Sequence, residues 1–130
     1  MQRSDYEAYL SHFNRRDYQG VLGFWAPAFE ARFAQVILRN GAELLRFYRF
    51  FHHYATEKID LLDFVSDERL VALRAVVRVE GVRQLSQETL NDAGYGSLHP
   101  VEAGEVLEIP QLIMYRVESG RFTEVWCAVV

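Results

Sequence analysis

The first part of the chain shows helical spacing of its apolar residues. Ser4 and Glu7 lie three residues apart, which is the spacing of a capping box, and apolar residues then recur every three or four positions. This pattern predicts a first helix from about Asp5 to Arg15. Asp17 predicts the N-cap of a short second helix, and Pro27 is expected to end it because proline cannot continue a helix.

A strand and a long helix are predicted next. Phe29, Ala31 and Phe33 alternate with charged residues at the period of two that a half-buried strand shows. Asn40-Gly41 then interrupts the chain. The segment that follows, GAELLRFYRFFHHY, carries two adjacent stripes at helical spacing, made of Leu44, Phe47, Phe51 and Tyr54 and of Leu45, Tyr48 and His52. We expect a long amphipathic helix here.

Four β segments fill most of the remaining chain. They cover residues 57–65, 69–82, 105–117 and 121–130. Asp67-Glu68 and Glu118-Ser119-Gly120 lie where tight hairpin turns would fall. The segments therefore predict a strongly curved antiparallel sheet. With the preceding helices they predict a single α+β domain over residues 1–130.

The connection from Val82 to Gly104 is long and contains three glycines and one proline. Its segment SQETLNDA favours one helical turn capped by Gly94. A connection of this length is either a lid over a binding site or an ordinary surface excursion. The sequence leaves both alternatives open.

The last two strands carry apolar side chains on both faces. Strand parity assigns one set to the interior: Pro110, Leu112, Met114, Val125, Cys127 and Val129. It places a second set outside: Ile113, Tyr115, Phe122 and Trp126. Because a face exposed to water normally alternates apolar with polar residues, this outer face needs a cover. We expect a homodimer packed through it, with Trp126 and Phe122 near the centre.

Composition and charge narrow the classes of partner. The 130 residues are 50% hydrophobic and 14% aromatic, which suits one sizeable core and an apolar pocket. The formal net charge of −4 at pH 7 disfavours nucleic acid. A single cysteine excludes an intramolecular disulfide, and no leader or apolar run of ~18 residues is visible. We expect a soluble, cytoplasmic protein with no membrane partner.

The order of elements resembles the nuclear transport factor 2-like (cystatin-like) superfamily, which includes the SnoaL-like cyclases and the ketosteroid isomerases. The likeness to the ketosteroid isomerase-related branch lies in Tyr9, Asn14, Asp17, Val21, Phe24 and Ala26, in the segment from Gly41 to Tyr48, and in the ending Gly120-Arg121-Phe122-x-x-Val125. The resemblance implies a cone-shaped curved antiparallel sheet wrapped around N-terminal helices. Such patterns specify a fold far better than a reaction.

The resemblance also implies roles for single residues. Tyr9 falls on the tyrosine that donates a hydrogen bond to the substrate carbonyl, and Tyr48 and Trp25 fall on supporting positions. The catalytic base of the isomerases falls on or beside Phe33, and their second acid falls on Leu112. Because neither side chain transfers a proton, true ketosteroid isomerase activity is not expected.

The epoxide hydrolases of the superfamily use an Asp-Arg-Asp site. Asp60, Asp63, Arg74 and Arg78 supply these residue types. However, the two arginines lie on the strand face opposite the apolar residues of their segment, so we expect them to face solvent or a dimer partner.

Glu108 is the best acid or base that strand parity offers. It shares the parity of Pro110 and Leu112, so it is predicted to point into the cone, with the wet mouth of the cone as the alternative. His52 and His53 point about 100° apart on a helix and cannot chelate one metal together. The expected lining of the cavity comprises Phe13, Trp25, Phe33, Tyr48, Phe51, Leu112 and Met114.

These features predict a protein that acts on a small hydrophobic molecule. It either binds that molecule or is a cofactor-independent isomerase, cyclase or dehydratase of SnoaL-like type, with an apolar, carbonyl-bearing ligand. Tyr9 would donate the hydrogen bond, and Glu108 would act as acid or base. The alternative is a non-catalytic ligand-binding or association module on the same fold. No Gly-rich phosphate loop or metal-ligand cluster is seen, so we expect no cofactor.

Overall fold

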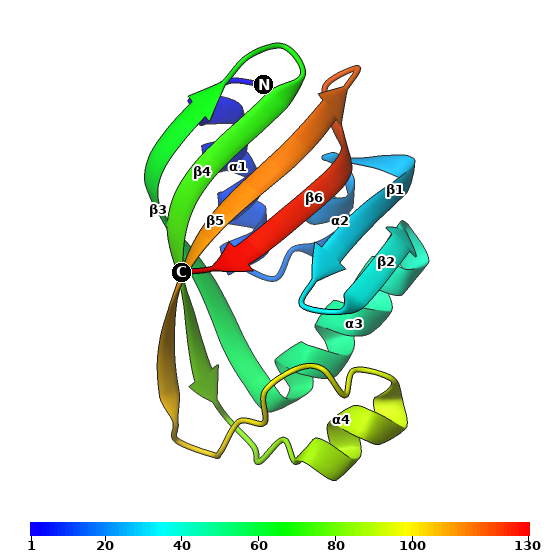
Figure 1. The fold of residues 1–130 in the computed structure, drawn as a ribbon, viewed down its shortest axis with the longest axis vertical. Helices are drawn as coiled ribbons and strands as arrows, with labels where there is room; N and C mark the ends of the chain where they lie inside the picture. The colour runs from blue at the N-terminus through cyan, green and yellow to red at the C-terminus, as the bar shows by residue number, and fades with distance from the viewer.

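The computed structural model describes residues 1–130 and shows six strands in one curved sheet with helices on its concave side (Figure 1). The helices are α1 (Arg3–Asn14), α2 (Tyr18–Leu22), α3 (Gly41–Tyr54) and α4 (Gln87–Ala93). The strands are β1 (Trp25–Phe33), β2 (Val36–Asn40), β3 (Ala55–Ser66), β4 (Leu70–Gly81), β5 (Val106–Glu118) and β6 (Arg121–Val129).

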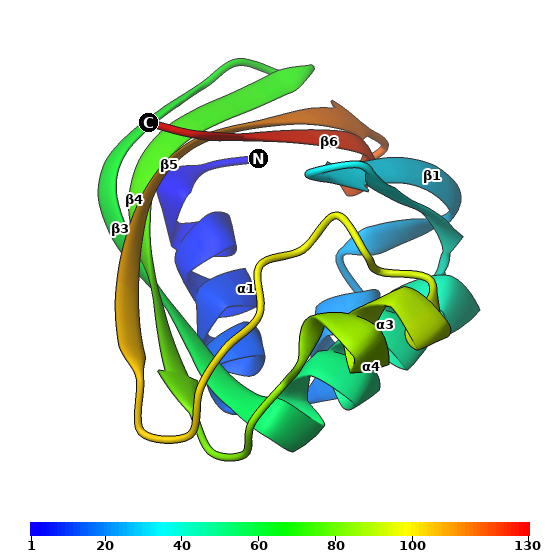
Figure 2. The same cartoon turned by 60° about the horizontal axis from the view of Figure 1, so that its bottom comes forward.

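The sheet has the strand order β2-β1-β6-β5-β4-β3, and every neighbouring pair is antiparallel except β1 and β6. The long strands curve around α1, while α3 and α4 lie on the open side (Figure 2). The predicted α+β class and the curved sheet wrapped around N-terminal helices are thus confirmed. None of the helices is both long and apolar enough to cross a membrane.

Short polar side chains set where the helices begin. Asp17 Oδ1 accepts a hydrogen bond from the Gly20 N–H at 3.1 Å, which confirms Asp17 as the N-cap of α2. The predicted capping box of α1 is wrong, because α1 begins two residues earlier than expected. At the observed start of α1, the Asp5 carboxylate accepts a hydrogen bond from the backbone N–H of Gln2 at 2.8 Å. Glu7 forms an ion pair with Arg3, which lies one helical turn earlier.

Pro27 lies inside β1 and does not end a helix, so that prediction is wrong. The pairing of β1 with both neighbouring strands is irregular around this residue. The register with β2 shifts between Ala28 and Ala31, and the register with β6 shifts between Trp25 and Glu30. A proline is tolerated at such a place because no regular ladder bond is lost.

Strand β2 was not predicted from the sequence. It pairs with β1 through a turn in which Ala34 adopts a left-handed φ of 54°. Glycine or asparagine usually marks such a turn, so an alanine there carries no signal. Ile37 also stands between the buried Val36 and Leu38 and hides their alternation.

The interior face of β5 is the opposite of the one predicted. Ile113 and Tyr115 are buried, at 5% and 4% exposure, whereas Leu112 and Met114 are 49% and 40% exposed. Both faces of β5 are apolar over this stretch, so hydrophobicity alone does not distinguish them. Arg116 shares the parity of the exposed residues and is the signal that identifies the outer face.

A bulge in β6 explains why Phe122 is also misplaced in the prediction. Arg116 pairs with Glu124 and Val117 pairs with Phe122, so Thr123 is an extra residue in β6. The extra residue lets Phe122 and Val125 both point inward, and Phe122 is fully buried. Of the four residues expected on the outer face, only Trp126 lies there, at 46% exposure.

The 82–104 connection contains the predicted helical turn. Ser86 caps the start of α4, and Gly94 ends it with a left-handed φ of 87°. The connection is held against the rest of the fold by a bridge between Leu85 and Val101 and by Tyr95, whose ring packs on Phe47 at 5.1 Å.

Candidate functional site

A cavity of about 440 Å³ lies between the concave face of the sheet and α3. Hydrophobic side chains make up 20 of its 24 lining residues. Six residues expected around a ligand do line it: Tyr9, Phe13, Trp25, Phe33, Tyr48 and Phe51. They come from α1, β1 and α3, because those elements pack their aromatic stripes toward the inside of the curved sheet.

Four polar residues interrupt this apolar lining: Glu57, Ser97, His99 and Gln111. Glu57 is the one carboxylate among them, and the sequence interpretation missed it. The signal was present, because Glu57 shares the parity of Ala55 and Ile59, whose side chains face the interior, whereas Lys58 between them is exposed.

Glu57 is held in place by a buried histidine. His52 Nε2 lies 2.9 Å from Glu57 Oε1, and His52 Nδ1 lies 2.8 Å from the Tyr18 hydroxyl. The His52 side chain is only 3% exposed, and that of Glu57 is 18% exposed. Both ring nitrogens are engaged, so the imidazole orients the carboxylate in the cavity.

Tyr9 presents a protonated phenol in the same cavity. Burial raises the pKa of Tyr9 above its ordinary value of 10.0, nearby Trp25 and Tyr48 partly offset this rise, and Cys127 and Glu57 add to it. The hydroxyl therefore stays protonated at neutral pH and can donate a hydrogen bond. Tyr9 and Glu57 both line the cavity, and the negative charge of Glu57 contributes to the raised pKa of Tyr9.

Glu108 does not point into the cone, so its predicted orientation is wrong. Its side chain is 65% exposed and pairs with Arg78 at 3.1 Å on the outer face of the sheet. The carboxylate inside the cavity is close in register: Glu57 lies opposite Val79, which lies opposite Leu107, the neighbour of Glu108. In β5 the neighbouring Leu107 lines the cavity in place of Glu108, and the carboxylate in the cavity comes from β3.

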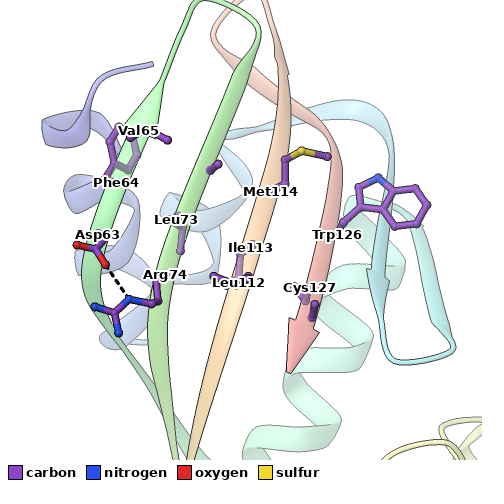
Figure 3. Close-up of a pocket in the computed structure, with 12 residues that line it drawn as sticks. Asp63, Phe64, Val65, Leu73, Arg74, Leu112, Ile113, Met114, Trp126 and Cys127 are labelled. Carbon is purple, nitrogen blue, oxygen red and sulfur yellow. Dashed lines mark hydrogen bonds and ion pairs between the residues drawn. The ribbon is translucent and has the colours of Figure 1, made fainter. Parts of the chain in front are cut away.

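Leu112 and Met114 are also on the outer face and do not line the cavity. They lie in a shallow outer groove of about 590 Å³, in which 10 of the 12 lining residues are hydrophobic. Figure 3 shows Met114 and Trp126 on this face and the ion pair of Asp63 and Arg74, with 2.7 Å between Oδ2 and Nε, at its other edge. The outward orientation predicted for Arg74 is confirmed.

The 82–104 connection forms one wall of the cavity. Ser97, Leu98, His99 and Val101 belong to the lining, and the segment crosses the open side of the sheet near α4 (Figure 2). It is therefore not a loop that projects from the surface, which was one of the two alternatives. Its residues supply two of the four polar groups that a ligand in the cavity would meet.

The arrangement suits proton transfer next to a carbonyl group. A carboxylate can accept a proton, and a neutral phenol can stabilise the oxygen on which negative charge develops. The apolar walls lower the polarity around both groups, which strengthens both interactions.

Comparisons with known proteins agree with the observed fold. A family model described as SnoaL-like domain matches residues 6–125. A comparison with curated proteins finds no match.

Solved structures show the same fold at low sequence identity. An NTF2-like protein of unknown function from Burkholderia pseudomallei K96243 has a TM-score of 0.73 at 16% identity. The match covers 95% of this chain and 86% of the Burkholderia chain. IdmH, a candidate polyketide cyclase from Streptomyces antibioticus, has a TM-score of 0.72 at 22% identity, with coverage of 99% and 92%. A candidate polyketide cyclase from Pseudomonas putida KT2440 has a TM-score of 0.72 at 18% identity, with coverage of 94% and 86%. The chain has the nuclear transport factor 2-like fold and belongs to the SnoaL-like domain family.

Proposed function

We propose that this protein is a cofactor-independent enzyme of the isomerase, cyclase or dehydratase type that acts on an apolar, carbonyl-bearing small molecule. The observation that carries the proposal is Glu57, the one carboxylate in a cavity built mostly from apolar and aromatic side chains. An unused carboxylate would be costly there, whereas one positioned by His52 is suited to proton transfer.

The proposed chemistry assigns one step to each polar group. The Tyr9 hydroxyl donates a hydrogen bond to the ligand carbonyl oxygen, and the Glu57 carboxylate takes a proton from the carbon next to that carbonyl. The electron pair of the broken C–H bond moves toward the carbonyl oxygen. Glu57 then returns the proton to another atom of the ligand, which shifts a double bond, closes a ring or helps a hydroxyl leave as water.

Two further observations support this class of reaction. The cavity volume of about 440 Å³ lies in the usual range of small-molecule sites, about 300 to 1,000 Å³. Two of the similar structures are candidate polyketide cyclases, whose names point to apolar carbonyl compounds. Phe33 lines the cavity. The resemblance to the ketosteroid isomerases places their catalytic base on or beside Phe33, so we do not propose that activity.

The second candidate function is ligand binding without chemistry. It is favoured by the dominance of hydrophobic residues in the lining, since such a cavity can hold an apolar molecule with Tyr9 as its single polar contact. The two functions differ in whether Glu57 reaches the ligand.

We also propose that two copies associate through the outer face of the sheet. Leu112, Met114 and Trp126 form an exposed apolar area there, at 49%, 40% and 46% exposure. Their ion-paired neighbours Asp63 and Arg74 supply a polar rim. This surface replaces the one expected from the sequence, because Ile113, Tyr115 and Phe122 are buried inside each chain.

A thermal-shift screen of hydrophobic ketones and lactones tests the proposal. We expect compounds that raise the melting temperature of the wild-type protein, with smaller shifts for Tyr9→Phe because the phenol donor is gone. Glu108→Gln serves as the control, since Glu108 lies on the outer face. Equal shifts in wild type and Tyr9→Phe would remove Tyr9 from the site.

A further inference from the structure

We propose that Tyr18 and His52 form a proton relay that connects Glu57 in the cavity with solvent at the protein surface. The proposal rests on the proposed role of Glu57 as an acid and base, and it adds a function for two residues that do not line the cavity. In this account Tyr18 and His52 are positioning and proton-transfer residues, and neither touches the ligand.

Two hydrogen bonds in series define the path. His52 Nε2 contacts Glu57 Oε1 at 2.9 Å, and His52 Nδ1 contacts the Tyr18 hydroxyl at 2.8 Å. Exposure changes along the path: the Glu57 side chain is 18% exposed and faces the cavity, His52 is buried at 3%, and Tyr18 on α2 is half-buried at the surface. The chain of contacts therefore leads from the cavity through the core to a residue that water can reach.

An imidazole bonded at both nitrogens can carry a proton without becoming charged. With Glu57 ionised, Nε2–H donates to the carboxylate and the Tyr18 hydroxyl donates to Nδ1. To protonate Glu57, the Nε2 proton moves to the carboxylate, the phenolic proton moves to Nδ1, and water at the surface replaces the phenolic proton. Each step moves one proton, and the sum is one proton taken from solvent and delivered to Glu57. The reverse sequence releases it.

A proton path from Glu57 to solvent is needed when a ligand fills the cavity. An apolar ligand displaces water from the lining, and the 82–104 connection covers one side, so Glu57 would lose direct contact with bulk solvent. A reaction that ends with a net proton gain or loss at Glu57 then requires another route to solvent. The contact with His52, which does not line the cavity, supplies that route.

The groups around the relay keep it aligned. The Tyr48 ring stacks on the His52 ring at 5.4 Å with planes 9° apart, and Phe13 meets it edge-on at 6.1 Å. Two cations face the outer end: Arg16 Nη1 lies 3.5 Å from the His52 carbonyl oxygen, and the Arg49 guanidinium lies 5.9 Å from the Tyr18 ring.

Their charges act on the phenol of Tyr18. Burial raises the pKa of Tyr18, and Arg16 and Arg49 partly offset that rise by favouring the ionised phenol. The negative charge of the Glu57 carboxylate attracts protons toward the cavity, and the positive charges of the two guanidinium groups repel protons from the outer end of the path. Both ends therefore favour proton movement in the same direction.

Nuclear magnetic resonance of histidine and glutamate side chains tests the relay without any ligand. The chain is labelled with ¹⁵N-histidine and ¹³C-glutamate, and the signals of His52 and Glu57 are assigned by their loss in His52→Gln and Glu57→Gln. We expect the Nε2–H tautomer of His52 opposite the ionised Glu57, and the Nδ1–H tautomer in Glu57→Gln, whose side-chain N–H can donate to Nε2 as a protonated carboxyl would. The same His52 tautomer in both proteins would overturn the proposal.

The variant Tyr18→Phe separates a relay from hydrogen bonds that only hold the structure. It keeps the ring that stacks on His52 but removes the oxygen that must accept from Nδ1–H, so the change of tautomer should disappear. Tyr54→Phe is the matched control, because Tyr54 ends α3 and does not contact His52 or Glu57, and it should retain the change.

The outcomes of this test and of the ligand screen are independent. A change of tautomer that persists in Tyr18→Phe would contradict the relay and leave the proposed ligand site standing. A relay present in a protein that binds no ketone or lactone would instead contradict the proposed function. If Tyr18→Phe fails to fold, a His52 tautomer that does not depend on residue 57 would still overturn the relay.

Discussion

His52 Nε2 lies 2.9 Å from Glu57 Oε1, and this contact joins the last turn of α3 to the beginning of β3. The two residues are only five apart, but the chain leaves the helix at Ala55 in an extended conformation and turns the carboxylate toward the cavity. A polar contact that is local in sequence therefore determines the orientation of a group in the proposed active site.

Removal of His52 is expected to destabilise the fold. His52→Ala leaves Glu57 without its partner in a largely apolar environment, and such losses cost about 1 to 3 kcal/mol in the free energy of unfolding. Urea denaturation measures the change. His53→Ala is the control, because His53 is exposed on the same helix and its removal should cost less than about 0.5 kcal/mol. Equal losses for the two variants would show that the contact with Glu57 contributes nothing to stability.

The protein is expected to lose stability in alkaline solution. Burial raises the pKa of Tyr6, Tyr48 and Tyr115 well above 10.0 in the folded chain, and it raises the pKa of Cys127 from 9.0 to about 12. Well below pH 9 both folded and unfolded chains keep these protons, so stability is intact. As the pH rises through the unfolded-state values, the unfolded chain releases protons that the folded chain retains, and the free energy of unfolding falls.

Denaturation in urea at pH 8 and at ~pH 10.5 tests this dependence. The midpoint should move to lower urea at the higher pH, and the Cys127 thiol should react with iodoacetamide much faster in the unfolded than in the folded chain. A midpoint that does not change would contradict the burial of these groups. Tyr115→Phe is a useful comparison, since it removes one of the ionising groups and should reduce the loss.

The elements that the sequence predicts well are those with one apolar face. The stripes of α3 and the Asp17 cap of α2 were read correctly because helical spacing and a short polar side chain each have one structural meaning. The class of fold followed from the order of such elements. The β2 strand was missed because its turn contains an alanine at positive φ, which no local rule anticipates.

The candidate site was harder to predict, because it depends on which face of a strand is inside. On β5 both faces are apolar, so a parity error moved Glu108 and Leu112 inward and Ile113 outward together. Glu57 was overlooked because a charged residue near the start of a strand looks like an ordinary surface residue. The contact of His52 with Glu57 can be recognised only when the bend between α3 and β3 is known.

The association of two copies is expected to depend on Trp126. Trp126→Glu places a charge in the outer groove, where a partner would bury it, so the dimer should weaken by at least about tenfold in its dissociation constant. Sedimentation equilibrium measures the change. Val82→Glu is the control, since Val82 is 53% exposed, close to the 46% of Trp126, but lies outside the groove. A wild-type protein that is monomeric at micromolar concentration would contradict the proposed interface.

The 82–104 connection is expected to become more protected when a ligand binds. Leu98 and His99 line the cavity, so an occupied cavity should slow amide hydrogen exchange in residues 96–100. The hairpin turn at Asp67-Glu68 lies far along the sheet and serves as an internal reference. Unchanged exchange in both segments, with a hydrophobic ketone such as 1-tetralone bound, would show that the connection is a fixed wall and not a lid.

The most direct test of the account follows the α-protons of 1-tetralone in D₂O by nuclear magnetic resonance, because Glu57 as a base must exchange them for deuterium. We expect wild-type protein to accelerate this exchange above the buffer rate, and Glu57→Gln to lose about 10² or more of the acceleration. Glu108→Gln should behave as wild type, since Glu108 pairs with Arg78 on the outer face. Equal exchange rates for wild type and Glu57→Gln, with the ketone bound to both, would contradict the assignment of Glu57 as the acid and base.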